Sequence, residues 1–397
     1  MDALRVGIAC FASYGGSGVV ATELGRVLAR KGHKVHFISS EVPFRLDDEA
    51  VLMGNVFFHE VTTVTYDALP AASYGLEMAS KIIQIATDEK LDLIHAHYAV
   101  PHAISGIVAK QVLKPRDLKI VTTLHGTDIT LVGRAPSFFP LTKWAIENSD
   151  AVTTVSAWLR ERTFSEFNVC VPVHVVHNFI DTDRFRPGLC PQARRQLAAP
   201  DEKIILHISN FRPVKRLTDV IEVFARVTAE VPSRLVLIGD GPERERALDL
   251  ARELGVLNRT YFLGKQTMIE RYFALADVFL FPSEYESFGV AALEAMSAEV
   301  PVVATTGSGL SEVVVEGRTG FLRPVGDVSA LAEAVLTLLR HEDLRREMGR
   351  AGRKRATCCF RAEAIRERYE SIYRAVLDGA PLPEQVPCNE AESPLAS

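Results

Sequence analysis

The sequence predicts an α/β protein built from two facing, doubly wound, Rossmann-like domains. The chain has 397 residues, which is too long for one ordinary hydrophobic core. Short apolar runs alternate with amphipathic stretches from end to end, which is typical of parallel sheets covered by helices on both faces. The alternation stops between Asn178 and Pro200, where Pro187, Gly188 and Pro191 fall close together. We place the domain linker in that segment.

The elements follow from this alternation in chain order. The first domain is expected at residues 1–177, and its patterns predict strands at Arg5–Cys10, Lys34–Ile38, Leu91–His95, Lys119–Leu124 and Ala151–Val155, with helices at Val19–Lys31 and Glu77–Glu89. The second is expected at residues 178–361, with strands at Lys203–Ser209, Arg234–Gly239, Asp277–Phe281 and Pro301–Ala304 and a helix at Val290–Met296. A last helix is expected near residues 362–378. Residues 379–397 are rich in Pro, Glu and Ser and should form a disordered tail.

Composition narrows the class of protein. The residues are 47% hydrophobic and 24% charged, as in a soluble globular enzyme, and the formal net charge of −5 disfavours non-specific nucleic-acid binding. No apolar stretch approaches the ~18–20 residues of a membrane helix, and the start of the chain lacks a signal-peptide pattern. The six cysteines show no CxxC spacing, so we expect reduced thiols in a cytoplasmic protein.

The most informative motif is a pair of carboxylates, Glu286 and Glu294. Glu286 opens the loop Glu286-Ser287-Phe288-Gly289, directly after an apolar strand, and Glu294 lies in the helix that follows. The free N–H groups at the start of that helix point toward an anion. Such a segment can hold a sugar at one end, a ribose at the other and a diphosphate between them, which indicates a nucleotide-sugar substrate.

Two further motifs follow strands of the second domain. Arg212 and Lys215 stand three positions apart at a helix entry, where two cations can neutralise a diphosphate. A solvated basic turn is the alternative. The turn Gly239-Asp240-Gly241-Pro242 lets the backbone approach a nucleotide closely, and a simple strand-end turn is the equal alternative.

The first domain has a glycine-rich turn, Tyr14-Gly15-Gly16-Ser17-Gly18, and a histidine, His125, at a strand end. The turn does not have the GxGxxG spacing, so a dinucleotide site is disfavoured, although a plain strand-to-helix turn remains an alternative. His125 is suited to donate a hydrogen bond to a sugar hydroxyl or a carboxylate, but a single strand-end histidine is more often structural.

We expect neither a metal nor a cofactor. His95, His97 and His102 have no further residue spaced to complete a zinc site. Asp181-Thr182-Asp183 has a metal-binding DxD pattern but lies in the linker, so a turn or helix cap is the better interpretation.

Together these motifs resemble the retaining glycosyltransferases of family 4, which have the GT-B fold with an active-site cleft between the domains. The resemblance covers residues 4–375. It also implies that the last helix, near residues 362–378, packs back on the first domain. The resemblance is closest to family members of the bacillithiol pathway. These enzymes transfer N-acetylglucosamine from UDP-N-acetylglucosamine to the hydroxyl of L-malate in the first step of that pathway. The motifs shared with those members are Gly15–Gly18, Pro43–Arg45, His95–Ala99, Thr122–Asp128, Asn178–Asp181 and Ser209–Arg212.

The resemblance implies a role for each matching residue. Glu294 would bind the ribose hydroxyls and Glu286 the sugar hydroxyls, while His125 would contact the donor sugar near the reacting centre. The diphosphate would be held by Arg212 and Lys215. Further donor contacts would come from the backbones of Gly16, Gly239, Ser287, Phe288 and Gly289. The acceptor site would be lined by Ser17, Tyr98, Thr123 and Asn178, with Arg45 and Arg134 as candidates for the malate carboxylates.

The family is thought to retain configuration by same-face attack, with the diphosphate accepting the acceptor's proton, and needs no metal if cations hold the diphosphate. The alternatives are a family 4 enzyme with another acceptor, such as an inositol phosphate or a lipid-linked sugar, a nucleotide-sugar epimerase of the same fold, and a non-enzymatic nucleotide-sugar sensor. The helix pattern at Val220–Ala229 is not conspicuously cationic, which argues mildly against a lipid acceptor. A homo-oligomer is possible, and no nucleic-acid or membrane partner is expected.

Overall fold

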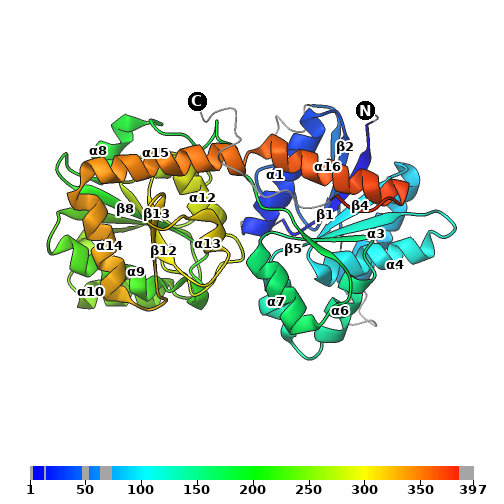
Figure 1. The fold of residues 1–397 in the computed structure, drawn as a ribbon, viewed down its shortest axis with the longest axis horizontal. Helices are drawn as coiled ribbons and strands as arrows, with labels where there is room; N and C mark the ends of the chain where they lie inside the picture. The colour runs from blue at the N-terminus through cyan, green and yellow to red at the C-terminus, as the bar shows by residue number, and fades with distance from the viewer. Residues whose placement is uncertain (1–2, 13–14, 47–52, 63–73, 384–397) are drawn as a thin grey trace. The chain divides into compact units, whose positions relative to one another are not determined.

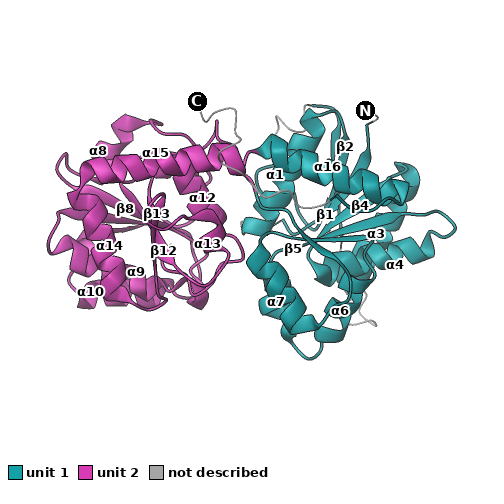
Figure 2. Ribbon diagram, viewed as in Figure 1, with its two compact units in different colours: residues 1–178, 362–387 teal, residues 179–361, 388–397 magenta. Residues whose placement is uncertain are grey.

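The structure is a computed structural model that describes residues 3–12, 15–46, 53–62 and 74–383 of the chain. These residues divide into two compact units (Figure 2). Unit 1 runs to Asn178 and resumes at Ala362, and unit 2 is Phe179–Arg361. The change of unit after Asn178 lies one residue beyond the position from which the sequence pattern places the second domain.

Unit 1 is built on a seven-stranded sheet in the order β3-β2-β1-β4-β5-β6-β7, in which every neighbouring pair is parallel. The inner strands are buried because helices cover the sheet (Figure 1). The strands are β1 (Arg5–Ala9), β2 (Lys34–Ser39), β3 (Val56–Glu60), β4 (Leu93–His97), β5 (Lys119–Leu124), β6 (Ala151–Thr154) and β7 (Val173–Val175).

The helices of unit 1 include the last one of the chain, α16 (Ala362–Asp378), which lies beside α1 (Figure 1). Glu370 of α16 accepts a hydrogen bond from His33 Nε2 at 2.7 Å, and the rings of Tyr369 and Tyr373 are buried. The other helices are α1 (Gly16–Arg30), α3 (Tyr74–Asp88), α4 (Ile104–Val112), α5 (Thr127–Thr130), α6 (Phe139–Glu147) and α7 (Ala157–Phe167), with short turns at η1 (Ala99–Ala103) and η2 (Val132–Arg134).

Unit 2 is a six-stranded parallel sheet in the order β10-β9-β8-β11-β12-β13. Its strands are β8 (Lys203–Ile208), β9 (Ser233–Ile238), β10 (Thr260–Phe262), β11 (Val278–Phe281), β12 (Val302–Thr305) and β13 (Gly320–Arg323). Its helical elements are η3 (Pro191–Ala193), α8 (Arg194–Leu197), η4 (Pro213–Lys215), α9 (Leu217–Thr228), α10 (Arg244–Glu253), η5 (Leu257–Arg259), α11 (Ile269–Phe273), α12 (Val290–Ser297), α13 (Leu310–Val313), α14 (Val328–Arg340) and α15 (Glu342–Cys359). The apolar faces of α9 and α14 meet β8, β9 and β11 in one continuous core.

The structure differs from the sequence-based expectations in a few elements. β4 begins and ends two residues later than expected, so that His97 belongs to the strand. The strands β3, β7, β10 and β13 were not expected; β7 and β10 have three residues each, and such short runs carry little periodic signal. Tyr14 and most of the expected tail lie outside the described residues.

The cysteines of the described residues are not all free thiols. Cys10, Cys170, Cys190 and Cys358 are free thiols, but Cys359 is disulfide-bonded, so the expectation of six reduced cysteines is wrong at this position. Spacing along the chain does not show which sulfur atoms meet in space.

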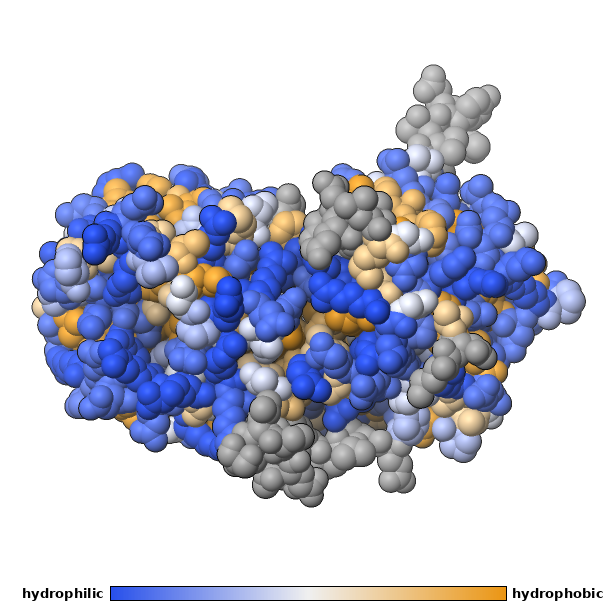
Figure 3. All heavy atoms as spheres, turned by 90° about the horizontal axis from the view of Figure 1, so that it is seen from above, coloured by the Kyte–Doolittle hydropathy of each residue, from blue (hydrophilic) through white to orange (hydrophobic). Residues whose placement is uncertain are grey.

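Among the described residues, no helix has both the length and the apolar character to cross a membrane. The face shown in Figure 3 is mainly hydrophilic, with scattered apolar side chains.

Candidate active site

The strand order reverses once in each sheet, between β1 and β4 in unit 1 and between β8 and β11 in unit 2. Open α/β sheets bind ligands at the carboxyl ends of their strands beside such a reversal. The loops that follow these strands and their neighbours contain most of the candidate residues. The fold therefore gathers them into two groups, one in each unit.

In unit 1, Ser17, Tyr98 and His125 lie together. α1 begins at Gly16 without a side-chain cap, which leaves its first N–H groups available to an anion. Ser17 Oγ, one residue later, accepts a hydrogen bond of 2.7 Å from the hydroxyl of Tyr98. The ring of Tyr98 lies 5.2 Å from that of His125, centroid to centroid.

The backbone of Tyr98 is strained. Its φ is 90°, which is an outlier for a bulky residue and costs about 1–3 kcal/mol. Two backbone hydrogen bonds hold it there, from the Tyr98 N–H to the Thr123 carbonyl at 2.9 Å and from the Ala103 N–H to the Tyr98 carbonyl at 3.1 Å. Strain of this kind clusters at ligand sites, because only a site that needs a particular side-chain direction keeps it.

Thr123 is placed differently from the other acceptor candidates. Its side chain is fully buried, and its hydroxyl makes hydrogen bonds of 2.7 Å with His95 Nε2 and with Thr153 Oγ1. The hydroxyl of Tyr369 lies 3.3 Å away, and that of Tyr373 makes a 2.7 Å bond with His95 Nδ1. The structure thus joins the Thr123 hydroxyl to α16 and does not expose it beside Tyr98.

His125 is held by one imidazole and one carboxylate. Its Nε2 lies 2.8 Å from Nδ1 of His97, and burial lowers the pKa of His125 to about 3. Asp128 accepts hydrogen bonds from the N–H groups of His125 at 3.1 Å and Gly126 at 2.9 Å, and from that of Ala99 at 3.1 Å. Burial nevertheless raises the pKa of Asp128 to about 6. Asp128 is a positioning residue that the sequence analysis missed, and its place three residues after His125 was the available signal.

The remaining candidates of unit 1 are already partnered or buried. Arg45 lies 3.9 Å from Glu23, and Arg134 lies 3.1 Å from Glu166. A malate carboxylate would have to share or displace these partners. Asn178, the last residue of unit 1 before the change of unit, is 5% exposed.

In unit 2, the loop after β8 supplies the two cations. Lys215 donates a hydrogen bond to Glu286, and its Nζ lies 5.4 Å from the centre of the Phe281 ring. Arg212 is exposed and makes no ion pair with any residue that the structure describes. The loop therefore offers one guanidinium open to solvent and one ammonium held in place.

The loop after β11 is fixed by backbone contacts. The Glu284 N–H donates to the Val214 carbonyl at 2.8 Å, and the Gly309 N–H donates to the Glu286 carbonyl at 2.9 Å. A Cβ on Gly309 would collide with the carbonyl of Ser287, so a glycine is needed for this close approach. These contacts hold the loop that carries Glu286 against the neighbouring loops.

α12 begins at Val290, after Gly289 with a φ of 95°, so the last loop amides lie at its N-terminus. Glu294 is 4% exposed in the second turn of the helix. Phe288 is buried against Phe360, with ring centroids 5.5 Å apart, so that only its backbone can face a ligand.

Gly239 joins the loops after β8 and β9. Its φ is 128°, and a Cβ there would overlap the carbonyl oxygen of Ser209. His207 bridges the same loop to β11 through hydrogen bonds to Ser209 Oγ at 2.8 Å and to the Leu280 carbonyl at 2.9 Å. The glycine turn seen in the sequence is therefore needed for the packing of these loops.

The DxD segment forms a turn. Asp181 Oδ1 accepts hydrogen bonds from the N–H groups of Asp183 at 3.1 Å and Arg184 at 3.0 Å. No group of three or more His, Cys, Asp or Glu side chains in the described ranges is arranged to hold a metal ion.

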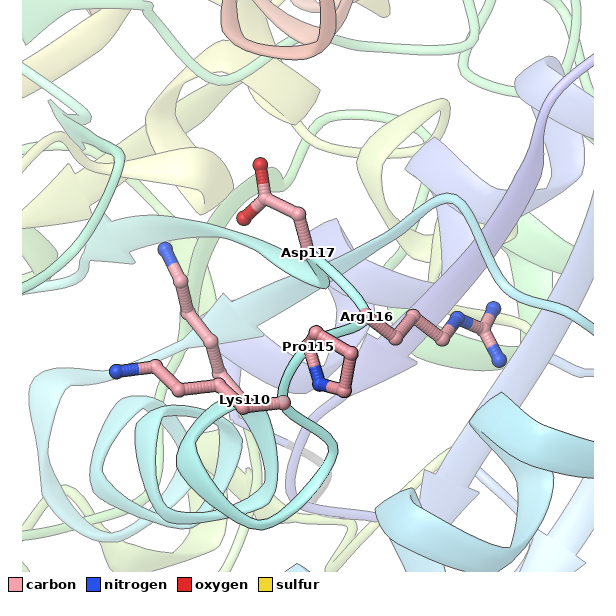
Figure 4. A pocket seen from close by; sticks show the side chains of 5 residues that line it. Lys110, Pro115, Arg116 and Asp117 are labelled. Atoms are coloured by element: carbon pink, nitrogen blue, oxygen red, sulfur yellow. The ribbon is translucent and has the colours of Figure 1, made fainter.

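A hollow of about 470 Å³ lies elsewhere, at the amino end of β5 in unit 1 (Figure 4). Two of its charged side chains have partners: Lys110 pairs with Asp150 at 2.7 Å, and Arg116, which extends away from Lys110 in the figure, donates to the Leu91 carbonyl at 2.7 Å. It opens at the sheet edge opposite the carboxyl ends, so we do not assign the active site there.

Comparison with known proteins identifies the family. Residues 14–184 match Glycosyltransferase Family 4, and residues 191–355 match Glycosyl transferases group 1. The chain is 44% identical over 375 residues to N-acetyl-alpha-D-glucosaminyl L-malate synthase of Bacillus anthracis, covering 94% of this chain and 97% of that protein. The chain is a family 4 glycosyltransferase. The expected family is thereby confirmed.

Solved structures confirm the expected fold class. Sucrose-phosphate synthase from Thermosynechococcus elongatus superposes with a TM-score of 0.78 at 24% identity, covering 95% of this chain and 100% of that one. Anabaena HepE in complex with UDP-glucose gives a TM-score of 0.78 at 19% identity, with 95% and 100% covered. This family 4 glycosyltransferase therefore has the GT-B fold, with two Rossmann-like domains.

Proposed function

We propose that this glycosyltransferase transfers N-acetylglucosamine from UDP-N-acetylglucosamine to the hydroxyl of L-malate with retention of configuration, as the first step of bacillithiol biosynthesis. The observation that carries the proposal is the 44% identity to the Bacillus anthracis L-malate synthase, which extends over both units. A relative of that identity and coverage is a better guide to donor and acceptor than the fold, which hosts many transferases.

Unit 2 has the chemistry that a UDP-sugar requires. Arg212 and Lys215 supply positive charge for the diphosphate, and the amides of Ser287, Phe288 and Gly289 lie at the N-terminus of α12. In the proposal Glu294 binds the ribose hydroxyls and Glu286 the sugar hydroxyls. Glu286 and Lys215 form an ion pair, and in the proposal both act near the bond between the sugar and the diphosphate. Gly239 contributes a close backbone approach.

Unit 1 supplies hydrogen-bonding groups for the acceptor and the donor sugar. Ser17 and Tyr98 line the acceptor site, and His125 contacts the sugar near the reacting carbon. Gly16 offers an N–H to the diphosphate. Thr123 supports the site through its buried hydrogen bonds. Asn178 remains a candidate for the acceptor site, and Arg45 and Arg134 remain candidates for the malate carboxylates.

The chemistry rests on stabilising the departing diphosphate. As the bond from the sugar C1 to the diphosphate oxygen breaks, negative charge grows on that oxygen, and preorganised cations lower the barrier. The malate hydroxyl forms the new bond to C1 on the same face, and its proton passes to the leaving diphosphate. Each step is then supplied without a metal ion or a protein nucleophile.

The test is to incubate the purified chain with UDP-N-acetylglucosamine and L-malate, with D-malate and succinate as matched acceptor controls. We expect UDP release that depends on L-malate, together with a product whose mass is that of malate plus one N-acetylglucosamine residue. UDP release without this adduct would reject malate as acceptor and leave the transferase assignment standing.

One observation favours a second candidate, a lipid-linked acceptor. Five large apolar side chains from Leu131 to Trp144 are 40–48% exposed in unit 1, and such a surface can meet lipid. These side chains are Leu131, Val132, Phe138, Leu141 and Trp144. Transfer to a lipid extract in detergent, with no transfer to malate, would favour this candidate. A cytoplasmic location and the absence of nucleic-acid and membrane partners remain part of the main proposal.

A further inference from the structure

Two neighbouring histidines share one hydrogen bond at the carboxyl edge of the unit 1 sheet. His97 is the last residue of β4, and His125 directly follows β5, the parallel neighbour of β4. Nδ1 of His97 lies 2.8 Å from Nε2 of His125. One of these nitrogens must carry the proton of this bond and the other must accept it.

Both rings are neutral near pH 7. Burial lowers the pKa of His125 to about 3, and burial, together with the neighbouring imidazoles, lowers that of His97 well below its ordinary value. Each ring therefore carries one N–H and one lone pair. The direction of the shared bond then fixes the tautomer of both rings.

The far nitrogen of His97 decides the direction. His97 is fully buried, and its Nε2 has no hydrogen-bond partner among the described residues. If His125 donated the shared bond, His97 would carry its own proton on this buried Nε2, as an N–H without an acceptor. If His97 donates, the buried Nε2 carries only a lone pair, and an unpaired acceptor is better tolerated than an orphaned N–H.

His102 provides a comparison, because its hydrogen-bond partner fixes its tautomer. Its Nδ1 lies 2.6 Å from the carbonyl oxygen of His97, which can only accept, so the proton is on Nδ1. The Nε2 of His102 is then an unprotonated lone pair, and it too is buried without a partner among the residues described. In both histidines, then, the ring N–H makes a hydrogen bond, and the buried nitrogen without a partner carries a lone pair.

We propose that His97 is a positioning residue that holds His125 in the tautomer protonated on Nδ1. His125 then presents an N–H donor outward from the strand end, suited to an oxygen acceptor such as a sugar hydroxyl. The nitrogen concerned makes no hydrogen bond with the described residues, and His125 is partly exposed. This inference deepens the role that the proposed function gives to His125 and rests on that role for its link to catalysis.

The direct test is NMR of the full chain labelled with ¹⁵N-histidine, because the ring-nitrogen shifts distinguish an Nδ1–H from an Nε2–H tautomer. His125→Asn identifies the signals of His125 by their loss. We expect wild-type His125 to carry its proton on Nδ1 at pH 7. A proton on Nε2 overturns the proposal. This readout needs no activity, so it stands apart from any failure of malate transfer.

A matched pair of variants tests the consequence. In His97→Asn the amide nitrogen takes the place of Nδ1 and can still donate, whereas in His97→Asp a carboxylate of the same shape can only accept. We expect His97→Asp to move the His125 proton to Nε2 and to lower kcat about 10²-fold below that of His97→Asn, with the UDP Kd equal in the two variants.

Thermal unfolding of both variants checks that each is folded. If both are folded and lose kcat equally, His97 acts through packing alone and the proposal fails. If either does not fold, the tautomer of the wild-type chain still decides the question.

Discussion

The two units place opposite chemistries at equivalent positions of their sheets. At the carboxyl edge of unit 1 the two hydroxyls of Ser17 and Tyr98 and the buried imidazoles are neutral and take part in hydrogen bonds, and burial holds the pKa values of the imidazoles low. At the same edge of unit 2 the side chains are charged, and the loops are fixed by backbone contacts at glycines. The same Rossmann-like fold can thus be suited to bind either hydroxyl groups or a diphosphate, depending on the residues that follow its strands.

The largest effect should come from Lys215, the ammonium held between Glu286 and the Phe281 ring. Lys215→Ala should lower kcat about 10²-fold or more, because one preorganised charge stabiliser is lost. Steady-state kinetics measures this, with Arg252→Ala as a control, since Arg252 is an exposed cation of the same unit whose one ion pair among the described residues is with Asp249. Full activity of Lys215→Ala would show that the charge of Lys215 does not stabilise the departing diphosphate.

The second effect concerns the glycine contacts of unit 2. Gly239→Ala should cost about 3 kcal/mol of unfolding free energy, because the new Cβ meets the Ser209 carbonyl and the φ is positive. Gly255→Ala is the matched control, with a φ of 70° and open space around it, and should cost about 1 kcal/mol. Urea unfolding of both variants tests this. Equal losses of unfolding free energy in the two variants would show that the loops around Gly239 can rearrange to accept the new Cβ.

The third effect is a pH dependence that should fall mainly on unit 1. Burial holds the folded pKa of His95 and His125 to about 3 and that of His102 to about 4, against 6.5 for a free histidine. Their contribution to stability is complete above pH 6.5 and is lost as the pH falls toward 4, at about 1.4 kcal/mol for each pKa unit traversed. Asp128 has the opposite sign, since its raised pKa of about 6 makes its contribution larger below that pH.

Three histidines outweigh one aspartate, so unit 1 should lose stability between pH 6.5 and 4. In unit 2 only His207 of the described residues has a comparable lowered pKa, about 4. Both tryptophans, Trp144 and Trp158, belong to unit 1, so tryptophan fluorescence during urea unfolding at pH 7.0, 5.5 and 4.5 follows that unit alone. A midpoint that stays constant over this range would contradict the neutral-histidine description.

The smallest effect should come from removing metal ions. If Arg212 and Lys215 carry the charge that a divalent ion carries elsewhere, EDTA should change the transfer rate by less than about twofold. The assay compares enzyme with EDTA, enzyme with EDTA plus excess Mg²⁺, and untreated enzyme. A strict requirement for the ion would show that the cations of unit 2 are insufficient by themselves.

The sequence predicted the fold well where the signal was local. β5, Lys119–Leu124, has the expected bounds, because its run of β-branched residues, Ile120 to Thr123, favours a strand. The loop Glu286–Gly289 was recognisable because its residues are consecutive. The short strands β7 and β10 escaped, since three residues do not establish a period.

Parts of the site that depend on distant residues were not predictable. The hydrogen bond of Tyr373 to His95 joins positions 278 residues apart, and the burial of the Thr123 hydroxyl follows from that packing. No pattern near Thr123 distinguishes a hydroxyl facing a ligand from one facing α16. The role of Asp128 likewise became visible only when the backbone N–H groups around it were placed.

The central claim is that the charges of unit 2 hold the nucleotide diphosphate while Ser17 and Tyr98 of unit 1 serve the acceptor. The most direct measurement is the UDP Kd, by titration calorimetry, of the wild-type chain, Lys215→Met and Tyr98→Phe. The account predicts a Kd at least about tenfold weaker for Lys215→Met, from one lost charge-assisted contact, and an unchanged Kd for Tyr98→Phe. A Tyr98→Phe variant that weakens UDP binding as much as Lys215→Met does would contradict it.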